Sequence, residues 1–242
     1  MKYTLITGAS RGIGRACAIE LAKERHNLIL VANTDKSGLD ETVSMIYEVH
    51  QNLPEISIGT YLCDVSDSEA VSGLFENFKK NGIRIDVLIN NAGIAFFGLV
   101  QDMTDDEWHK VISTNLDSIF YMSRAAIPDM LHVHSGHIIN ISSYWGIKGA
   151  ALEAAYSASK GGVNAFSLAL ADELEPSGIK VNAVICEFID TDMNAHLTDE
   201  EKLEAATQMP SGRIISPEEV AKLVAKIISD DSAENETLVS IS

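Results

Sequence analysis

Tryptophan, cysteine, proline and basic residues are scarce in this 242-residue chain, which has 2 Trp, 3 Cys, 5 Pro and 18 Lys plus Arg against 35 Asp plus Glu. The formal net charge of -17 argues against nucleic acids and anionic membranes as partners, because both would repel the chain. No apolar run reaches the 18 residues or so of a membrane-spanning helix. The first ten residues also lack the apolar stretch and cleavage site of a secretion signal.

The cysteines Cys17, Cys63 and Cys186 are too few and too widely spaced for a disulfide framework or a metal site. Free thiols are typical of a reducing compartment, so we expect a cytoplasmic protein. The histidines of "HVHSGH" (132–137) are the densest group of potential metal ligands. They precede an expected strand, at the edge of the sheet opposite a ligand crevice, and we therefore expect no metal.

Apolar runs of strand length alternate with helical patterns along the whole chain. Continuous Val, Ile and Leu runs are typical of strands buried on both faces of a parallel sheet. Their alternation with helices predicts one α/β domain over 1–242, a Rossmann-type doubly wound parallel sheet of about seven strands with helices on both faces. The expected strands are 3–7, 27–32, 56–62, 85–91, 137–142, 179–185 and 237–241, and the expected helices are 13–24, 39–50, 68–80, 105–131, 153–175 and 216–229. The irregular stretch 186–215 is long for a loop, and we expect a substrate lid over about 188–213.

The stretch "TGASRGIG" (7–14) joins the first expected strand to the first helix. Its glycines Gly8, Gly12 and Gly14 allow a sharp turn and a close approach to a ligand. The helix N-terminus behind them offers free N–H groups to a pyrophosphate. The spacing is G-x-x-x-G-x-G rather than G-x-G-x-x-G, and glycines also serve ordinary turns. This motif alone therefore does not establish a nucleotide-binding site.

Two further stretches, "CDV" (63–65) and "NNAG" (90–93), follow expected strands at the edge where ligands bind in open parallel sheets. Asp64 could accept a hydrogen bond from an adenine amino group. Alternatively it caps the helix that begins near 68, a role that Asp67 fills equally well. "NNAG" could be a plain turn, but at this edge its backbone would run along a bound cofactor.

The stretch "AAYSASKGG" (154–162) places Tyr156 and Lys160 four residues apart, on one face of the expected helix. Ser143 ends the strand before it. A phenol is a weak acid at neutral pH, and a nearby ammonium lowers its pKa. Together with a serine hydroxyl that binds the same oxygen, the pair suits proton transfer to a carbonyl that is reduced to an alcohol. A packed tyrosine and a solvated lysine on a helix are the alternative for this spacing alone.

In combination these motifs resemble the short-chain dehydrogenase/reductase family over residues 1–230, and within it they look most like the 3-oxoacyl-acyl-carrier-protein reductases. The motifs that carry the family resemblance occur in the order "TGASRGIG", "CDV", "NNAG", "TNLDS", "NISS" and "YSASKGG". Those closest to the reductases are "RAAIPDM", "SGHIINISS", "AYSASKGGVNAFSLALADEL" and "GRIISPEEVAKLV".

The resemblance implies a role for each site residue. Ser143 would orient and polarise the substrate carbonyl, and Tyr156 would donate the proton. Lys160 would lower the pKa of Tyr156 and hold the nicotinamide ribose, while Asn115 would anchor a water that links Lys160 to solvent. The implied cofactor-binding residues are Gly8, Ser10, Arg11, Gly12, Ile13, Gly14, Asn33, Asp64, Val65, Asn91, Ala92, Gly93, Tyr156, Lys160 and Thr191. Residues that would line a substrate pocket beside Ser143 and Tyr156, or else pack the lid onto the core, are Trp145, Ile147, Met193, Leu197 and Met209.

The cofactor is expected to be NADP(H) rather than NAD(H). The position that the resemblance makes decisive is Asn33, which is neutral, and Arg11 could pair with a 2′-phosphate. Asp35 lies near the distance at which NAD-binding proteins carry a ribose-binding acid. Asp35 and Ser37 could instead begin the next helix.

The resemblance implies an NADP(H)-dependent enzyme of fatty acid biosynthesis that reduces 3-oxoacyl groups on acyl carrier protein. A reductase of a sugar, steroid or small ketone is the alternative, and a weakly active dinucleotide-binding protein is a third. An acidic carrier protein would be repelled by this chain unless Arg124, Lys148 or Arg213 gather at the cleft. The resemblance also implies a homodimer or homotetramer, joined through the helices near 105–131 and 153–175.

The chain departs from the family at Cys186-Glu187, where relatives usually carry Pro-Gly, and at its end "ETLVSIS", which lacks their glycine-rich segment. Glutamate adds bulk and charge to a turn that passes the nicotinamide. One possibility is that Glu187 turns outward. We expect instead that it intrudes mildly on the site, weakens cofactor binding and disorders the lid, because an unpaired charge is costly there.

Overall fold

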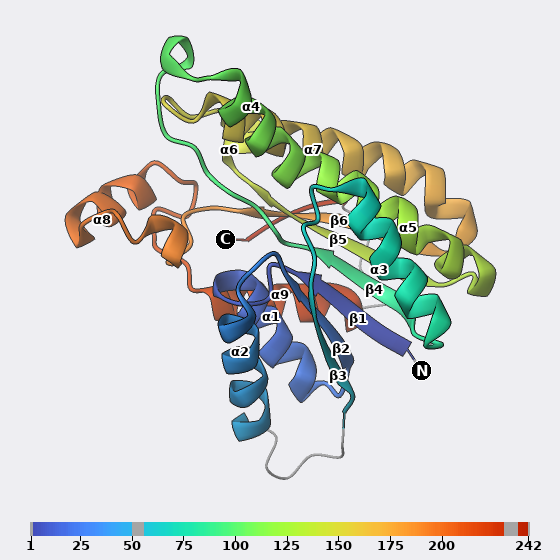
Figure 1. The fold of residues 1–242 in the computed structure, drawn as a ribbon. Coiled ribbons are helices and arrows are strands. Elements are labelled where there is room, and N and C mark those ends of the chain that lie inside the picture. Colours follow the sequence, from blue (N-terminus) through green and yellow to red (C-terminus); the bar gives the residue numbers. More distant parts are fainter. Residues whose placement is uncertain (1, 50–55, 230–236, 242) are drawn as a thin grey trace.

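The computed structural model describes residues 2–49, 56–229 and 237–241 (Figure 1). Its seven strands form one parallel sheet in the order β3-β2-β1-β4-β5-β6-β7. They are β1 (Lys2–Thr7), β2 (Asn27–Ala32), β3 (Ile58–Leu62), β4 (Arg84–Asn90), β5 (Gly136–Ser143), β6 (Ile179–Cys186) and β7 (Leu238–Ser240). The expected Rossmann-type α/β fold is confirmed. The chain moves outward from β1 in one direction and from β4 in the other, which opens a crevice at the carboxyl ends between them.

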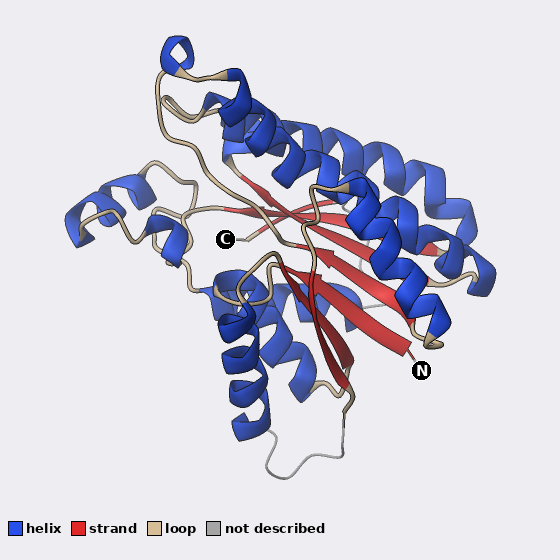
Figure 2. Cartoon of the chain, viewed as in Figure 1, coloured by secondary structure: helices blue, strands red, loops and turns tan. Residues whose placement is uncertain are grey.

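Helices cover both faces of the sheet (Figure 2). Apolar side chains of α1 (Gly12–Lys23), α2 (Lys36–Val49) and α9 (Pro217–Ser229) pack on one face. Those of α3 (Ser68–Lys80), α5 (Ser118–Val133) and α7 (Ala154–Leu174) pack on the other. The shorter helices are α4 (Asp105–Ile112), α6 (Trp145–Lys148) and α8 (Asp199–Thr207), with single turns η1 (Val100–Asp102), η2 (Ser113–Asp117), η3 (Glu175–Ser177) and η4 (Asp192–Asn194). The last residue of the helix expected over 39–50 lies outside the described residues.

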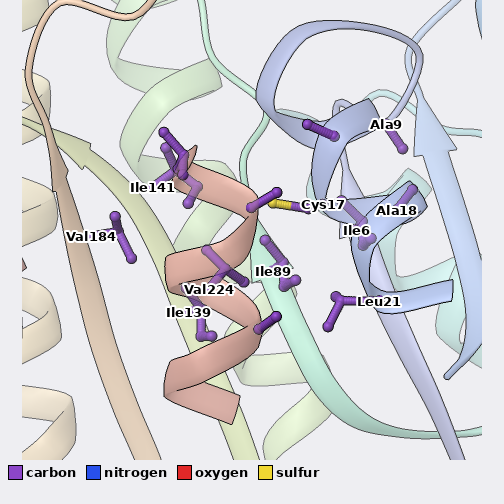
Figure 3. Packing of buried hydrophobic residues seen from close by; sticks show 14 of the residues in the cluster. Ile6, Ala9, Cys17, Ala18, Leu21, Ile89, Ile139, Ile141, Val184 and Val224 are labelled. Carbon is purple, nitrogen blue, oxygen red and sulfur yellow. The ribbon is translucent and has the colours of Figure 1, made fainter. Parts of the chain in front are cut away.

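The core between α1, α9 and the sheet is closely packed and rich in aliphatic side chains (Figure 3). Cys17 and Leu21 of α1 and Val224 of α9 are fully buried there, with Ile89 and Ile139 of the sheet. Burial of aliphatic side chains contributes about 25 cal/mol for each Å² removed from water, which makes these contacts the main stabilising term for the layers. This packing fixes α1 beneath the crevice, so its N-terminus is held at the carboxyl edge of the sheet.

Two regions differ from the expected pattern. The helix expected over 105–131 is divided into α4 and α5 by the π-helical turn η2, and that turn carries the buried Asn115. The stretch 186–215 is not irregular throughout, because it contains α8 (orange in Figure 1) and a parallel bridge between Ile189 and Ile215. Helix α8 begins with a capping box between Thr198 and Glu201, which satisfies N–H groups at its start.

Within the ranges that the structure describes, the helices are all too short or too polar to serve as membrane spans.

Candidate active site

A cleft of about 1300 Å³ opens at the carboxyl ends of the strands. It extends from the glycine-rich turn after β1, past the ends of β2, β4, β5 and β6, to α8 and the segment before it. Its lining includes nearly all of the predicted cofactor residues, namely Gly8, Ser10, Arg11, Gly12, Ile13, Asn33, Asp64, Val65, Asn91, Ala92, Gly93, Tyr156, Lys160 and Thr191. Gly14 and Asn115 are not part of this lining, and both pack behind the residues that are.

The glycine-rich turn has the geometry of an anion cradle. Gly12 has φ +55°, and a Cβ there would lie 3.5 Å from Thr191, so the glycine keeps this approach open. Helix α1 starts at Gly12 without a side-chain cap, so N–H groups of its first turn remain available to a ligand. Gly14 serves packing instead, since a Cβ there would lie 2.2 Å from the carbonyl oxygen of Gly8. The residues present therefore fit a dinucleotide pyrophosphate.

The stretch 90–93 is tied to the end of β1. Asn91 donates its side-chain N–H to Thr7 O at 2.9 Å and to Gly8 O at 3.1 Å, and the Thr7 hydroxyl accepts from the N–H groups of Asn91 and Ala92. These bonds hold the two turns side by side along the cleft. Asp64 caps no helix, because it accepts from Ser66 while Asp67 caps α3. The capping alternative for Asp64 is therefore wrong, and its exposed carboxylate lines the cleft.

A smaller hollow of about 290 Å³ adjoins the glycine-rich turn and contains Arg15, a residue that sequence reasoning missed. Arg15 Nη2 donates to Glu41 Oε2 at 2.7 Å and to Ser10 O at 2.5 Å. The exposed Arg11 also lines this hollow, and its Nε lies 3.9 Å from Asp192. The Arg15 guanidinium is thus already paired within the protein, whereas the Arg11 guanidinium is exposed.

Asp35 lies in the same hollow, and its carboxylate accepts a hydrogen bond from Gly38 N–H at 2.9 Å. That bond, and then one from Ser10, lower the pKa of Asp35 below its usual value. The carboxylate sits at the start of α2, where Ser37 also donates to it at 3.1 Å. The prediction that Asp35 and Ser37 begin this helix is confirmed.

Ser143, Tyr156 and Lys160 meet at the middle of the cleft. Ser143 ends β5, and its Oγ accepts the N–H of Trp145 at 3.1 Å. Tyr156 and Lys160 lie on α7, and the side chain of Ser143 is close enough to Tyr156 to affect its pKa. Lys160 is almost fully buried, and its Nζ donates to Ile141 O at 2.8 Å. A hydroxyl pair is thus placed to contact one substrate oxygen.

The pKa values of this group follow from burial. Burial raises the pKa of Tyr156, and nearby Cys186 adds to the rise, while the hydrogen bond from Ser143 opposes it. Burial lowers the pKa of Lys160 to about 8. The Lys160 ammonium lies 5.8 Å from the centre of the Tyr156 ring. Desolvation of the phenolate dominates the pKa of Tyr156 in this structure, and the lowering of that pKa by Lys160 stays a prediction.

Asn115 links the loop after β4 to α7. Its amide nitrogen donates to Ile94 O at 2.9 Å and to Ser159 Oγ at 3.0 Å, and its oxygen accepts from Ile94 N–H at 2.8 Å. The π-helical turn places this side chain behind Gly93, beside Lys160. These bonds make Asn115 a brace of the site, and its role in anchoring a water stays a prediction.

Glu187 is half-buried at the end of β6, and its carboxylate is paired. Its Oε2 accepts the N–H of Ser211 at 3.0 Å and the hydroxyl of Ser211 at 2.5 Å. The expectation of an unpaired charge that disorders the lid is therefore wrong, because Ser211 lies within reach of Glu187 and satisfies it.

Apolar contacts hold the same segment. Phe188, Ala206 and Met209 form a small buried cluster against which Trp145 and Leu197 pack. The cleft lining includes Trp145, Met193, Leu197 and Met209. All of these except Met193 also belong to the apolar cluster that packs the segment 188–213. Ile147 is exposed and is not part of the lining.

Of the basic residues considered for carrier binding, Lys148 lines the cleft. Arg124 instead lies over the rings of Phe120 and Tyr121 on α5, at 4.7 and 5.6 Å, and Arg213 pairs with Glu219 at 2.8 Å. Three lining residues that sequence reasoning missed are Lys110, Glu153 and His196. No pattern in the sequence marks them, because α4, the loop before α7 and the segment 188–213 bring them to the cleft from different parts of the chain.

The ranges described by the structure hold no group of three or more His, Cys, Asp or Glu placed to bind a metal. In the "HVHSGH" stretch, His137 Nε2 lies 2.6 Å from Asn182 Oδ1.

The family model "short chain dehydrogenase" matches residues 2–202 of the chain. The chain belongs to the short-chain dehydrogenase family. It is 39% identical to the 3-oxoacyl-acyl-carrier-protein reductase FabG of Haemophilus influenzae over 231 residues, which cover 96% of this chain and 92% of that protein. It is 36% identical to FabG of Escherichia coli over 232 residues, which cover 96% of this chain and 91% of that protein.

Among solved structures, levodione reductase superposes on this chain with a TM-score of 0.90 at 32% identity. The match covers all of this chain and 96% of the levodione reductase chain. This short-chain dehydrogenase is therefore an NAD(P)-dependent oxidoreductase.

Proposed function

We propose that this protein reduces a carbonyl group to an alcohol with NADP(H), and that its substrate is a 3-oxoacyl thioester of acyl carrier protein. The observation that carries the reaction is that Ser143 and Tyr156 line the cleft together, with Lys160 one turn further along α7. The substrate rests on the similarity to the FabG reductases.

The nicotinamide, when bound, supplies the hydride that reaches the carbonyl carbon. Tyr156 donates the proton that reaches the oxygen. The phenol is protonated at neutral pH and so holds the proton to be donated, although its raised pKa makes it a weaker acid until a nearby cation stabilises the phenolate. Ser143 donates a hydrogen bond to the same oxygen and so orients the carbonyl. Lys160 holds the nicotinamide ribose and, while protonated, stabilises negative charge that develops at Tyr156.

The NADP(H) preference is supported by the groups around the small hollow. Arg11 and Arg15 approach it with guanidinium groups, and the neutral Asn33 lines the cleft beside it. Asp35 is the opposing feature, because an ionised carboxylate there repels a 2′-phosphate. The first turn of α1 binds the pyrophosphate, and Asp64 and Val65 flank the adenine. Asn91, Ala92 and Gly93 flank the ribose, and Thr191 contacts the carboxamide.

A second candidate substrate is a small ketone. Of the three basic side chains expected to receive an acidic carrier protein, Arg124 and Arg213 are engaged elsewhere, and the net charge is -17. The similarity to levodione reductase points the same way.

The experiment compares three substrates with NADPH as the reductant and records the absorbance of the reduced nicotinamide. They are acetoacetyl-acyl-carrier protein, an acetoacetyl thioester of a short pantetheine analogue, and a cyclic diketone. Turnover that is fastest with the carrier-bound thioester supports the proposal. Equal turnover of both thioesters removes the carrier protein from it, and turnover of the diketone alone favours the second candidate. If none of the three substrates is reduced, the proposed reaction is wrong.

We also propose one catalytic domain with a substrate lid over 188–213, a homodimer or homotetramer in solution, and a cytoplasmic location. The buried free thiols of Cys17, Cys63 and Cys186 suit a reducing compartment.

A further inference from the structure

Glu153 is a partly buried carboxylate that lines the cleft three residues before Tyr156. It is the residue that precedes α7, yet its side chain makes no capping hydrogen bond to that helix. Among the described residues, its carboxylate takes part in no hydrogen bond or ion pair. Its backbone is engaged on both sides, with Ala150 and Ser157. Nothing in the fold therefore requires an acid here, although burying one is unfavourable.

Glu153 shares the cleft lining with Ser143 and Tyr156, and its charge acts on the proton donor. Burial raises the pKa of Glu153, and the exposed His196 of the lid segment partly opposes this. The same carboxylate contributes to raising the pKa of Tyr156, so its field extends to the proton donor. The buried Lys160 donates to the backbone of β5, whereas the exposed Lys148 lies over the Trp145 ring at 5.9 Å and is screened by solvent.

We infer that Glu153 is a specificity-determining residue that favours neutral or cationic carbonyl substrates over those that carry an anionic group near the carbonyl. This inference rests on the proposed carbonyl reduction at Tyr156. An anion beside the reacting carbonyl would share a partly desolvated part of the cleft with the Glu153 carboxylate, where like charges repel more strongly than in water. A cation would be attracted, and a neutral ester or thioester would be unaffected.

With such a charge preference, this reaction follows a step in which the acid is activated as an ester or a thioester. A free 3-oxo acid carries its carboxylate next to the carbonyl and would be excluded, whereas its ester or thioester is neutral at that position. The reaction that supplies the substrate must therefore already have joined the acid to an alcohol or a thiol.

The test uses acetoacetate esters of matched shape and different charge. They are the 3,3-dimethylbutyl ester, its trimethylammonium isostere (the choline ester) and the 2-sulfoethyl ester. We compare kcat/KM with NADPH at pH 7.5 for the native protein and for Glu153→Gln, which keeps the shape and removes the charge. Glu204→Gln is the matched control, since it removes one exposed carboxylate from α8 outside the cleft lining.

In the native protein we expect kcat/KM for the choline ester to exceed that for the sulfoethyl ester by about tenfold or more. Glu153→Gln should reduce this ratio by at least about fivefold, and Glu204→Gln should leave it unchanged. An unchanged ratio in Glu153→Gln, or an equal change in both variants, overturns the inference. Calorimetric titration of the choline ester and its dimethylbutyl isostere reads the charge preference without turnover. Absence of reduction therefore counts against the proposed function, whereas equal affinity of the two isosteres in the native protein counts against the role of Glu153.

Discussion

Glu187 and Ser211 are joined by two hydrogen bonds to one carboxylate oxygen, at 3.0 Å from the backbone N–H and 2.5 Å from the hydroxyl. The pair connects the end of β6, beside the catalytic residues, to the far end of the lid. Between the two lie η4 and α8, which an ion pair of Lys202 with Asp190 at 2.8 Å also ties back. Glu187, which we expected from the sequence to disturb the site, therefore helps to hold the segment 188–213 in place. Charge-assisted bonds of this kind are stronger than those between neutral groups.

Replacing Glu187 by Ala should loosen the lid. We expect KM for the carbonyl substrate to rise by about three- to tenfold, with a smaller change in kcat, and limited proteolysis within 188–213 to become faster. Ser211→Ala removes the hydroxyl alone and should produce a smaller effect in the same direction. The double replacement of Cys186 by Pro and Glu187 by Gly should also speed proteolysis. Proteolysis at the native rate in all three variants would show that the pair does not hold the lid.

Tyr156→Phe removes the proposed proton donor while it keeps the ring. We expect kcat to fall by roughly 100-fold or more, the usual scale of general acid catalysis, with little change in NADPH affinity. The control is Tyr144→Phe, a half-buried phenol on the adjacent segment. Turnover near the native level in Tyr156→Phe would assign the proton transfer to another group.

Arg11→Ala should weaken NADPH more than NADH, because NADPH alone carries the 2′-phosphate. We expect the ratio of kcat/KM for NADPH to that for NADH to fall by about tenfold. Asp35→Asn should raise the same ratio, since it removes the carboxylate that faces the phosphate. Steady-state kinetics with both cofactors measures the two ratios. If Arg11→Ala lowers kcat/KM by the same factor with both cofactors, the guanidinium binds a group that both cofactors carry, such as the pyrophosphate.

Phe120 on α5 and Leu168 on α7 are large apolar side chains that are 43% and 46% exposed. Both helices were expected at a subunit interface. A charge placed there should be buried without a partner, so Leu168→Glu should shift the protein from dimer or tetramer to monomer in multi-angle light scattering. Leu203→Glu on α8, also exposed, is the control. A monomeric native protein would contradict the interface.

The sheet could be predicted from the sequence because each buried strand is a continuous aliphatic run with helical periodicity on either side. The capping box of Thr198 and Glu201 was also legible, but α8 has little apolar periodicity and was therefore expected to be irregular. The π-helical turn around Asn115 has no marker of this kind, and the expected helix ran straight through it.

The catalytic residues could be predicted from the sequence for a different reason, since Tyr156 and Lys160 share a helix and Ser143 ends the strand before it. Contacts between segments that are distant in the sequence could not be predicted. The bonds of Glu187 to Ser211 join residues 24 positions apart, and their formation depends on the path of the whole lid. The pKa of Tyr156 likewise follows from burial in the folded chain, which spacing alone does not reveal.

Lys160 gives the protein a stability that depends on pH. Burial lowers its pKa from 10.5 to about 8 in the folded state, while the unfolded chain keeps the higher value. Below pH 8 the lysine is charged in both states, and the cost of burying the ammonium opposes folding. Between pH 8 and 10.5 the folded protein releases the proton and the unfolded chain retains it. The unfolded state then binds more protons at this lysine, so Lys160 adds a contribution to the free energy of unfolding that rises with pH across this window. The buried thiols Cys17, Cys63 and Cys186 oppose it, because burial raises their pKa values.

Lys160→Met should therefore be more stable than the native protein at pH 7, although it should be inactive. The shift from 10.5 to about 8 corresponds to roughly 3 kcal/mol, from which the lost hydrogen bond to Ile141 O subtracts about 1 kcal/mol. Urea unfolding between pH 7 and 10 measures the difference between the two proteins, and we expect it to shrink as pH rises. Burial also raises the pKa values of the three cysteines and of Tyr156, which makes stability fall with pH in both proteins, so the difference between the two proteins is the quantity to compare. Lys148→Met, at an exposed position on α6, should show the native pH dependence. A pH-independent difference between Lys160→Met and the native protein would mean that folding does not lower the pKa of Lys160.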